Sequence, residues 1–214
     1  MNTKKQTATQ HLFTNKQLRT LLVPIMVEQL LSSLMGTADT MMVSNVGSAA
    51  ISAVSLVDAI NILVIQALSA LAAGGAILCS QYLGSQNLKK AKRSAEQVLF
   101  VMLVLSCSLS LLCLIFRFPL LRLIFGTVDT DVMANSQIYF FFTLLSFPFI
   151  GLYEAGASLL RAQNNTKGPM TISILTNFLN IGGNAILIFV FGMGVAGAAI
   201  STLVSRIFCA IVVI

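Results

Sequence analysis

Long apolar stretches alternate with short polar segments along almost the whole chain. The apolar stretches cover roughly residues 18–46, 52–82, 94–116, 133–160, 169–191 and 195–214. A helix needs about 20 mostly apolar residues to cross the hydrocarbon core of a bilayer, and each stretch reaches that length. The pattern therefore predicts an all-α polytopic membrane protein with six transmembrane helices over residues 18–214, preceded by a polar tail over residues 1–17.

The composition agrees with this prediction. Hydrophobic residues make up 57% of the sequence and charged residues only 9%, against about 25% charged residues in an ordinary soluble domain. The four cysteines lie inside apolar stretches, at spacings typical of neither a disulfide framework nor a metal site. The single histidine, His11, falls in the polar tail and is expected to be solvated. We expect no enzymatic activity and no nucleic-acid partner, because the net charge of +6 has no basic face with interleaved aromatic residues.

The basic residues are divided unevenly between the two sides that six spans define. The side that holds the N-terminus carries Lys4, Lys5, Lys16, Arg19, Lys89, Lys90, Lys92, Arg93, Arg161 and Lys167. The other side carries Arg117 and Arg122, accompanied by Asp129 and Asp131. Cytoplasmic connections are enriched in Lys and Arg, so we predict a multi-pass protein of the inner (plasma) membrane with a cytoplasmic N-terminus. Residues 82–97 are predicted to form a solvated basic loop.

The first apolar stretch contains two acidic residues that share one face of the predicted helix. Glu28, Ser32, Met35 and Asp39 fall within about 40° of one line at 100° per residue. A carboxylate near the centre of a membrane helix costs about 2.5–3.5 kcal/mol, so it is retained only where it faces protein or water. Asp39 is therefore interpreted as a proton or cation site, with a structural aspartate bonded to a neighbouring helix as the alternative.

The fifth stretch carries a row of amides. Asn177, Asn180 and Asn184 point within about 60° of one another on a helix. Hydrogen bonds between helices would account for such a row, although each is worth only about 0.6 kcal/mol. Carboxylate and amide oxygens are also the ligands that hard cations prefer. Beside Asp39, the amide oxygens become candidate ligands for a hard cation.

Other polar residues within the apolar stretches are possible cavity-lining positions. Arg206 must pair, reach the interface or face a cavity. Glu154 lies seven residues before Arg161 and is interpreted first as a hydrated or ion-paired acid. Asp58 lines an outer vestibule or stays hydrated at the headgroup level, and both alternatives remain open. The possible cavity-lining set comprises Glu28, Gln29, Ser32, Met35, Asn61, Asn177, Glu154 and Arg206.

Several motifs, in this order and spacing, resemble the N-terminal half of multidrug and toxic compound extrusion (MATE) transporters. They are "VPIMVEQLLSSLMGTADTMMVSNVG", "AAISAVSL", "QYLGSQNLKKA", "LLRAQNNTKGPM" and "NFLNIGGNAILI" followed by "GVAGAAIST". The resemblance implies one six-helix lobe of a twelve-helix antiporter that exports organic cations in exchange for sodium or protons. It also implies that Asp39 is the coupling carboxylate and that Asn180 and Asn184 are its partners. Asn184 stands where one branch of the family has a second acid, which favours the NorM-like branch.

The resemblance also implies the partners. They are the lipid bilayer, an organic cation and a second lobe, supplied by a missing C-terminal half or a second copy. Sodium or a proton is the coupling ion, and no other cofactor is expected. Because the chain stops on an apolar "VVI" without a polar flank, we expect a truncated reading frame. Two alternatives are a non-transporting membrane scaffold or assembly subunit, and a lipid-linked precursor flippase, for which only Arg206 is a fitting cavity cation.

Overall fold

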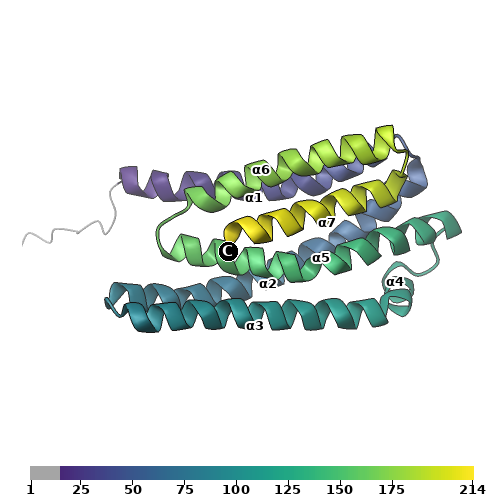
Figure 1. Ribbon diagram of the computed structural model, residues 1–214. Coiled ribbons are helices and arrows are strands. Elements are labelled where there is room, and N and C mark those ends of the chain that lie inside the picture. The colour runs from purple at the N-terminus through teal and green to yellow at the C-terminus, as the bar shows by residue number, and fades with distance from the viewer. Residues whose placement is uncertain (1–14) are drawn as a thin grey trace, which may run out of the picture.

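The computed structural model describes residues 15–214, which form long helices lying side by side (Figure 1). The elements are α1 (Asn15–Val43), α2 (Ser48–Gly84), α3 (Leu88–Ile115), α4 (Arg117–Phe125), α5 (Thr130–Ala162), α6 (Lys167–Asn184), the π-helical segment η1 (Ala185–Val190) and α7 (Gly194–Val213). No strand occurs in this range, so the all-α prediction is confirmed. Most of the predicted tail, with His11, lies outside the described residues.

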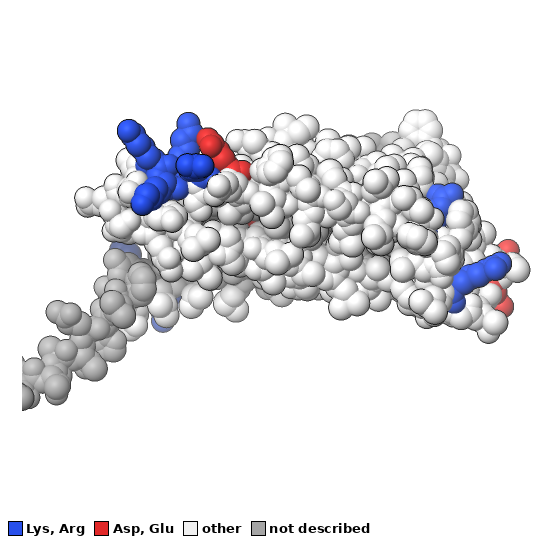
Figure 2. All heavy atoms as spheres, turned by 90° about the horizontal axis from the view of Figure 1, so that it is seen from below, with Lys and Arg blue, Asp and Glu red and all other residues white. Residues whose placement is uncertain are grey.

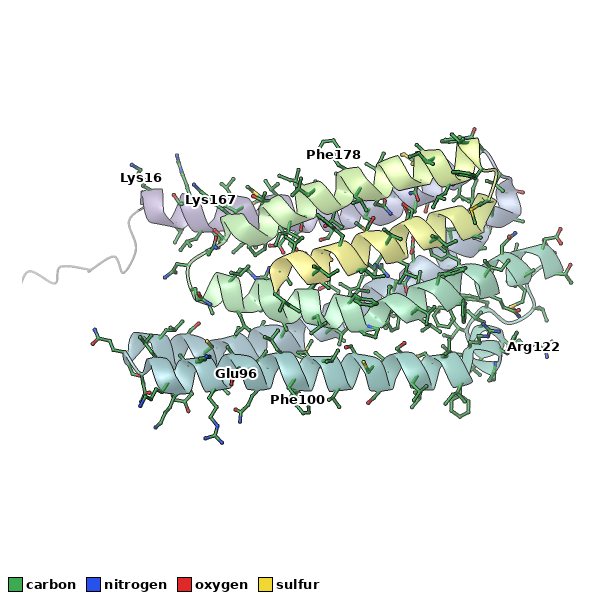
Figure 3. All side chains as sticks on the ribbon, in the orientation of Figure 1. Lys16, Glu96, Phe100, Arg122, Lys167 and Phe178 are labelled. Atoms are coloured by element: carbon green, nitrogen blue, oxygen red, sulfur yellow. The ribbon has the colours of Figure 1, made fainter. Side chains whose placement is uncertain are left out.

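The described residues include six helices that are long and apolar enough to span a membrane. Charged side chains gather at the two ends of the face in Figure 2, and the broad surface between them is uncharged. Lys16 and Lys167 lie at one end of the bundle and Arg122 at the other, while Phe100 and Phe178 point outward between the ends (Figure 3). An apolar belt between two charged rims matches the profile of a bilayer.

The connection between the second and third spans is much shorter than predicted. Helix α2 continues to Gly84 and α3 begins at Leu88, so the prediction of a basic loop over residues 82–97 is wrong. The side chain of Asn87 caps the start of α3 by accepting a hydrogen bond from the backbone N–H of Lys90 (3.2 Å). Lysine and arginine are good helix formers. The basic residues therefore extend α3 beyond the apolar belt as its first turns.

Helix α5 forms the centre of the bundle, packing against α2, α3 and α7. Its side chains Tyr139, Phe140 and Phe147 are fully buried. Helix α1 lies against α6 and α2 at the edge of this core. A membrane protein buries its polar groups where helices meet, and α1, α2, α5, α6 and α7 meet around the polar residues described below.

Two features mark the end of α6, where it packs against α7. Gly183 faces the side chain of Ser201, and a Cβ atom added at Gly183 would overlap it. After Asn184 the helix widens into η1, where the N–H of Phe191 donates to the carbonyl of Ile186 five residues earlier (3.1 Å). Short π-helical segments often occur at functional positions. Here the change in helical pitch follows directly after Asn184.

Candidate ion site and cavity

Asp39 is buried at the junction of four helices, with 1% of its surface exposed. Its Oδ1 accepts a hydrogen bond from Nδ2 of Asn184 on α6 (2.5 Å). Its Oδ2 accepts from Oγ1 of Thr202 on α7 (2.8 Å) and from the hydroxyl of Tyr139 on α5 (3.1 Å). All three donors are neutral groups. The carboxylate on α1 is thus surrounded by neutral dipoles, and a single positive charge, a proton or a cation, would neutralise it.

The predicted amide row divides between three environments. Asn184 contacts Asp39 directly, whereas Asn180 donates from Nδ2 to Oγ1 of Thr202 (3.1 Å) and so lies one step behind the carboxylate. Asn177 donates instead to the carbonyl of Ser173 on its own helix (2.9 Å). Within residues 15–214, the Oδ1 atoms of Asn180 and Asn184 are buried without a hydrogen-bond partner. Together with the carboxylate, these two unpaired amide oxygens are the kind of oxygen ligands that a hard cation prefers.

A cavity of about 610 Å³ lies between α1, α2, α5, α6 and α7. This is within the range of about 300–1,000 Å³ that is usual for small-molecule sites. Asp39 and Asp58 lie on its wall, and apolar residues such as Ile62 and Ile150 complete the wall. Seven of the predicted cavity positions also lie there: Gln29, Ser32, Met35, Asn61, Asn177, Glu154 and Arg206. Asn180 and Asn184 are absent from the described wall; both are fully buried, and they donate to Thr202 and Asp39 respectively.

Glu28 occupies a different place from the one expected. It lies outside the described cavity wall and forms an ion pair with Arg161, whose Nη1 is 2.9 Å from Oε1 and 3.0 Å from Oε2. The hydroxyl of Tyr153 also donates to Oε1 (3.0 Å). Glu28 and Asp39 share a face of α1 but lie three turns apart, so Glu28 meets the end of α5. Arg161 thus pairs with Glu28, and Glu154 remains on the cavity wall.

Arg206 faces the cavity, one of the three alternatives that the sequence left open. Its Nη1 donates to Oγ of Ser146 on the neighbouring helix (2.7 Å). Among the residues that the structure describes, the wall carries three acids, Asp39, Asp58 and Glu154, and this single arginine. An acidic excess in a largely apolar chamber favours a cationic ligand.

Sequence reasoning missed two site residues and left a third undecided. Tyr139 and Thr202 belong to types that are common in membrane helices, and no sequence signal distinguished them. Asp58 was noticed as an acid in an apolar stretch, but its two interpretations were left open. It lies on the cavity wall, and the hydroxyl of Tyr139 is 3.2 Å from its Oδ1. The signal that could have decided for the cavity is Asn61, a predicted cavity-lining residue three positions further along the same helix face.

Comparison with known proteins gives consistent results. The MatE family model matches residues 24–186. The chain is 33% identical over 189 residues to an uncharacterized transporter, YisQ, of Bacillus subtilis, with 86% of this chain and 41% of that protein covered. It is 29% identical over 198 residues to a probable multidrug resistance protein, NorM, of Thermotoga maritima, covering 89% and 42%.

Solved structures share the same arrangement of helices. A multidrug resistance MATE family transporter of the MOP superfamily, in an outward-facing conformation, superposes with a TM-score of 0.84 at 25% identity. The alignment covers 92% of this chain and 44% of that one. The chain therefore spans about two fifths of the length of the curated relatives it matches.

Proposed function

The chain belongs to the MatE family of membrane transporters, and on that premise we propose that it is the N-terminal lobe of an antiporter. The complete transporter exports organic cations in exchange for sodium or protons across the inner (plasma) membrane. A second lobe, either the C-terminal half or another copy, completes the substrate chamber. The acidic excess around a chamber of drug-like size supports a cationic substrate.

Sodium and protons compete for Asp39 in this proposal. A proton needs only the carboxylate, whereas sodium also needs oxygen ligands. Asn184 now presents its NH2 group to Asp39, and a half-turn of the amide would present the unpaired Oδ1 instead. The two orientations of an amide differ only in the exchange of O and N. Asn180 supplies the second unpaired oxygen, behind Thr202.

One observation carries the proposal. Asp39 is almost completely buried among neutral hydrogen-bond donors, and yet it contributes to the wall of the cavity. A carboxylate in that position is protected from bulk water but remains within reach of a substrate or an ion in the chamber. Neutralising it changes the charge of both the helix junction and the chamber.

Orientation and location are parts of the same proposal. The start of α1, the first turns of α3, the end of α5 and the start of α6 carry most of the described basic residues, and the opposite end carries Arg117 and Arg122 with two acids. Lys16 and Lys167 mark the more basic end in Figure 3. The positive-inside rule places that end in the cytoplasm.

Sodium binding to the purified 214-residue chain in lipid nanodiscs tests the proposal. Calorimetric titrations would be made at two pH values, one on each side of neutral, for the parent, Asp39→Asn and Asn184→Leu. Sodium affinity should fall in the parent when the pH is lowered, disappear in Asp39→Asn, and weaken about tenfold in Asn184→Leu, the cost of a lost contact to a charged group.

The matched control is Asp129→Asn, which removes an exposed acid outside the site and should leave sodium affinity unchanged. Asn184→Leu should weaken sodium binding without weakening proton binding, since the NH2 group that it removes donates to the charged form of Asp39. Sodium affinity that is indifferent to both pH and Asp39→Asn would contradict the proposed ion site.

Lipid-linked precursor flipping is the second candidate, and Arg206 is the observation in its favour. A guanidinium on the cavity wall suits the anionic headgroup of such a lipid. Three acids on the same wall oppose that ligand, so we place organic-cation export first.

A further inference from the structure

Helix α3 lies on the side of the bundle away from the cavity. It packs mainly against α2 and α5, and none of its described residues lines the cavity. In Figure 1 it forms the edge of the bundle opposite α1 and α6. A second lobe that completes the chamber does not need this edge. The outer face of α3 is therefore left to the bilayer.

The first turns of α3 carry a cluster of positive charge. Lys89, Lys90, Lys92 and Arg93 are all exposed, and Glu96 is the one acid among residues 88–97. Within the described chain, only Lys92 of these four forms an ion pair, at 4.0 Å from Glu96. Four positive charges and one negative charge leave this decapeptide with a net charge of +3. The view from the α3 side shows Lys and Arg gathered at this end of the molecule, with an acid beside them (Figure 2).

A shallow groove continues from this cluster along α3. It is lined by Arg93, Glu96, Gln97, Phe100 and Val101, which the spacing of an α-helix places on one face. Phe100 and Val101 are 67% and 56% exposed, and Phe100 points away from the bundle in Figure 3. The groove is polar next to the basic cluster and apolar where it enters the uncharged belt.

This groove has the polarity and length of the boundary between lipid headgroups and acyl chains. Arg93 and Phe100 are seven positions apart, which is about 10 Å along an α-helix. The headgroup region extends about 5–8 Å beyond the hydrocarbon core on each side. A phospholipid whose phosphate lies at Arg93 would therefore bring the upper part of its acyl chains to Phe100 and Val101.

We propose that the first turns of α3 form a binding site for an anionic phospholipid. The phosphate contacts Arg93 and a neighbouring lysine, and the acyl chains lie on Phe100 and Val101. Arginine binds phosphate through two parallel N–H groups, while lysine adds a point charge. Clusters of four or more Lys and Arg beside a membrane helix are typical of anionic lipid binding. An acidic protein segment would match the charge, but it would leave the apolar part of the groove without a partner.

Fluorescence quenching by brominated lipids tests this site. The chain contains no tryptophan, so Phe100→Trp places a single reporter in the groove. The variant is reconstituted in phosphatidylcholine vesicles that contain brominated phosphatidylglycerol, or the same fraction of brominated phosphatidylcholine. The anionic lipid should be preferred at the reporter about fivefold or more, the factor expected for one basic residue near an anionic surface. High salt should reduce this preference.

Two variants in the Phe100→Trp background change the charge of the site in opposite directions. The triple variant Lys89→Gln/Lys90→Gln/Arg93→Gln should bring the preference close to one. Glu96→Gln should raise it, because an acid leaves the groove, and a loss of folding cannot produce such a gain. Lys167→Gln is the matched control: it removes a basic residue from α6 at the same end of the bundle and should leave the preference unchanged (Figure 3).

A second reporter separates a lipid site from the general field of the basic end. Phe178 on α6 is 73% exposed and also points outward, so Phe178→Trp should show a clearly smaller preference for the anionic lipid (Figure 3). The same preference at both reporters, or equal quenching by the two lipids at Phe100→Trp, would overturn the site. A preference that survives the triple variant would also overturn it. Failure of the ion site at Asp39 would leave all of these quenching ratios unchanged.

Discussion

The ion pair between Glu28 and Arg161 makes a quantitative prediction about stability. The Glu28 side chain is 4% exposed, and Arg161 Nη1 contacts both of its oxygens. Removing only the cation in Arg161→Met leaves a buried carboxylate with Tyr153 as its remaining described donor. Breaking a buried pair in this way costs about 3–5 kcal/mol. We therefore expect Arg161→Met to lower the free energy of unfolding by that amount.

The opposite change should cost less. Arg161 is 20% exposed and also donates to Oγ of Ser158 (3.0 Å), so its charge retains contact with water after Glu28→Gln. That variant should lose about 1.5–3 kcal/mol, the value of hydrogen bonds to a charged group. The double variant Glu28→Leu/Arg161→Met should recover most of the loss, because an apolar pair of similar volume has no charge to solvate.

Denaturation in mixed detergent micelles, monitored by circular dichroism, measures these differences. Lys92→Met is the matched control, since the Lys92–Glu96 pair is 4.0 Å apart with side chains 81% and 65% exposed. It should change stability by less than about 0.5 kcal/mol. A loss in Arg161→Met no larger than that of the control, or no larger than that of Glu28→Gln, would refute the reasoning.

Three further outcomes are expected. A reporter fused at Lys90 should read cytoplasmic and one at Asp129 external; a cytoplasmic signal at Asp129 would break the six-span topology. Gly183→Ala should destabilise the chain in the same denaturation assay, because its Cβ would overlap the side chain of Ser201, and Ser201→Gly in the same chain should recover part of the loss. Arg206→Gln should raise the affinity of a fluorescent organic cation at least about threefold, since a like charge leaves the cavity wall; unchanged affinity would mean that the guanidinium is screened from the ligand.

The helices and Asp39 were predictable because each produces a local signal. Apolar runs of sufficient length identify the spans, and an acid inside such a run is conspicuous. Asn184 was within reach because helix geometry placed it on the same face as Asn177. The start of α3 was not predicted correctly, since a run of Lys residues looks like a loop until the helix is seen to extend beyond the belt.

The partners of the acids were not predictable because they lie far away in the sequence. Tyr139 lies 100 residues from Asp39, and Thr202 lies 163 residues from it. Their roles depend on how α5 and α7 pack against α1, and nothing local records that packing. The same holds for Glu28, whose position on the face of Asp39 suggested the cavity until the end of α5 brought Arg161 to it.

The π-helical segment bears on how this chain tolerates insertions and deletions. Each residue removed from a helix turns everything beyond it by about 100° and would ordinarily misdirect a whole face. A π turn already holds one residue more than an α turn, so a single deletion within Ala185–Val190 is absorbed by relaxation to α-helical pitch. Asn184, upstream of the segment, keeps its direction toward Asp39. Length variation between related proteins should therefore concentrate in these six residues and be absent from the turns just before them.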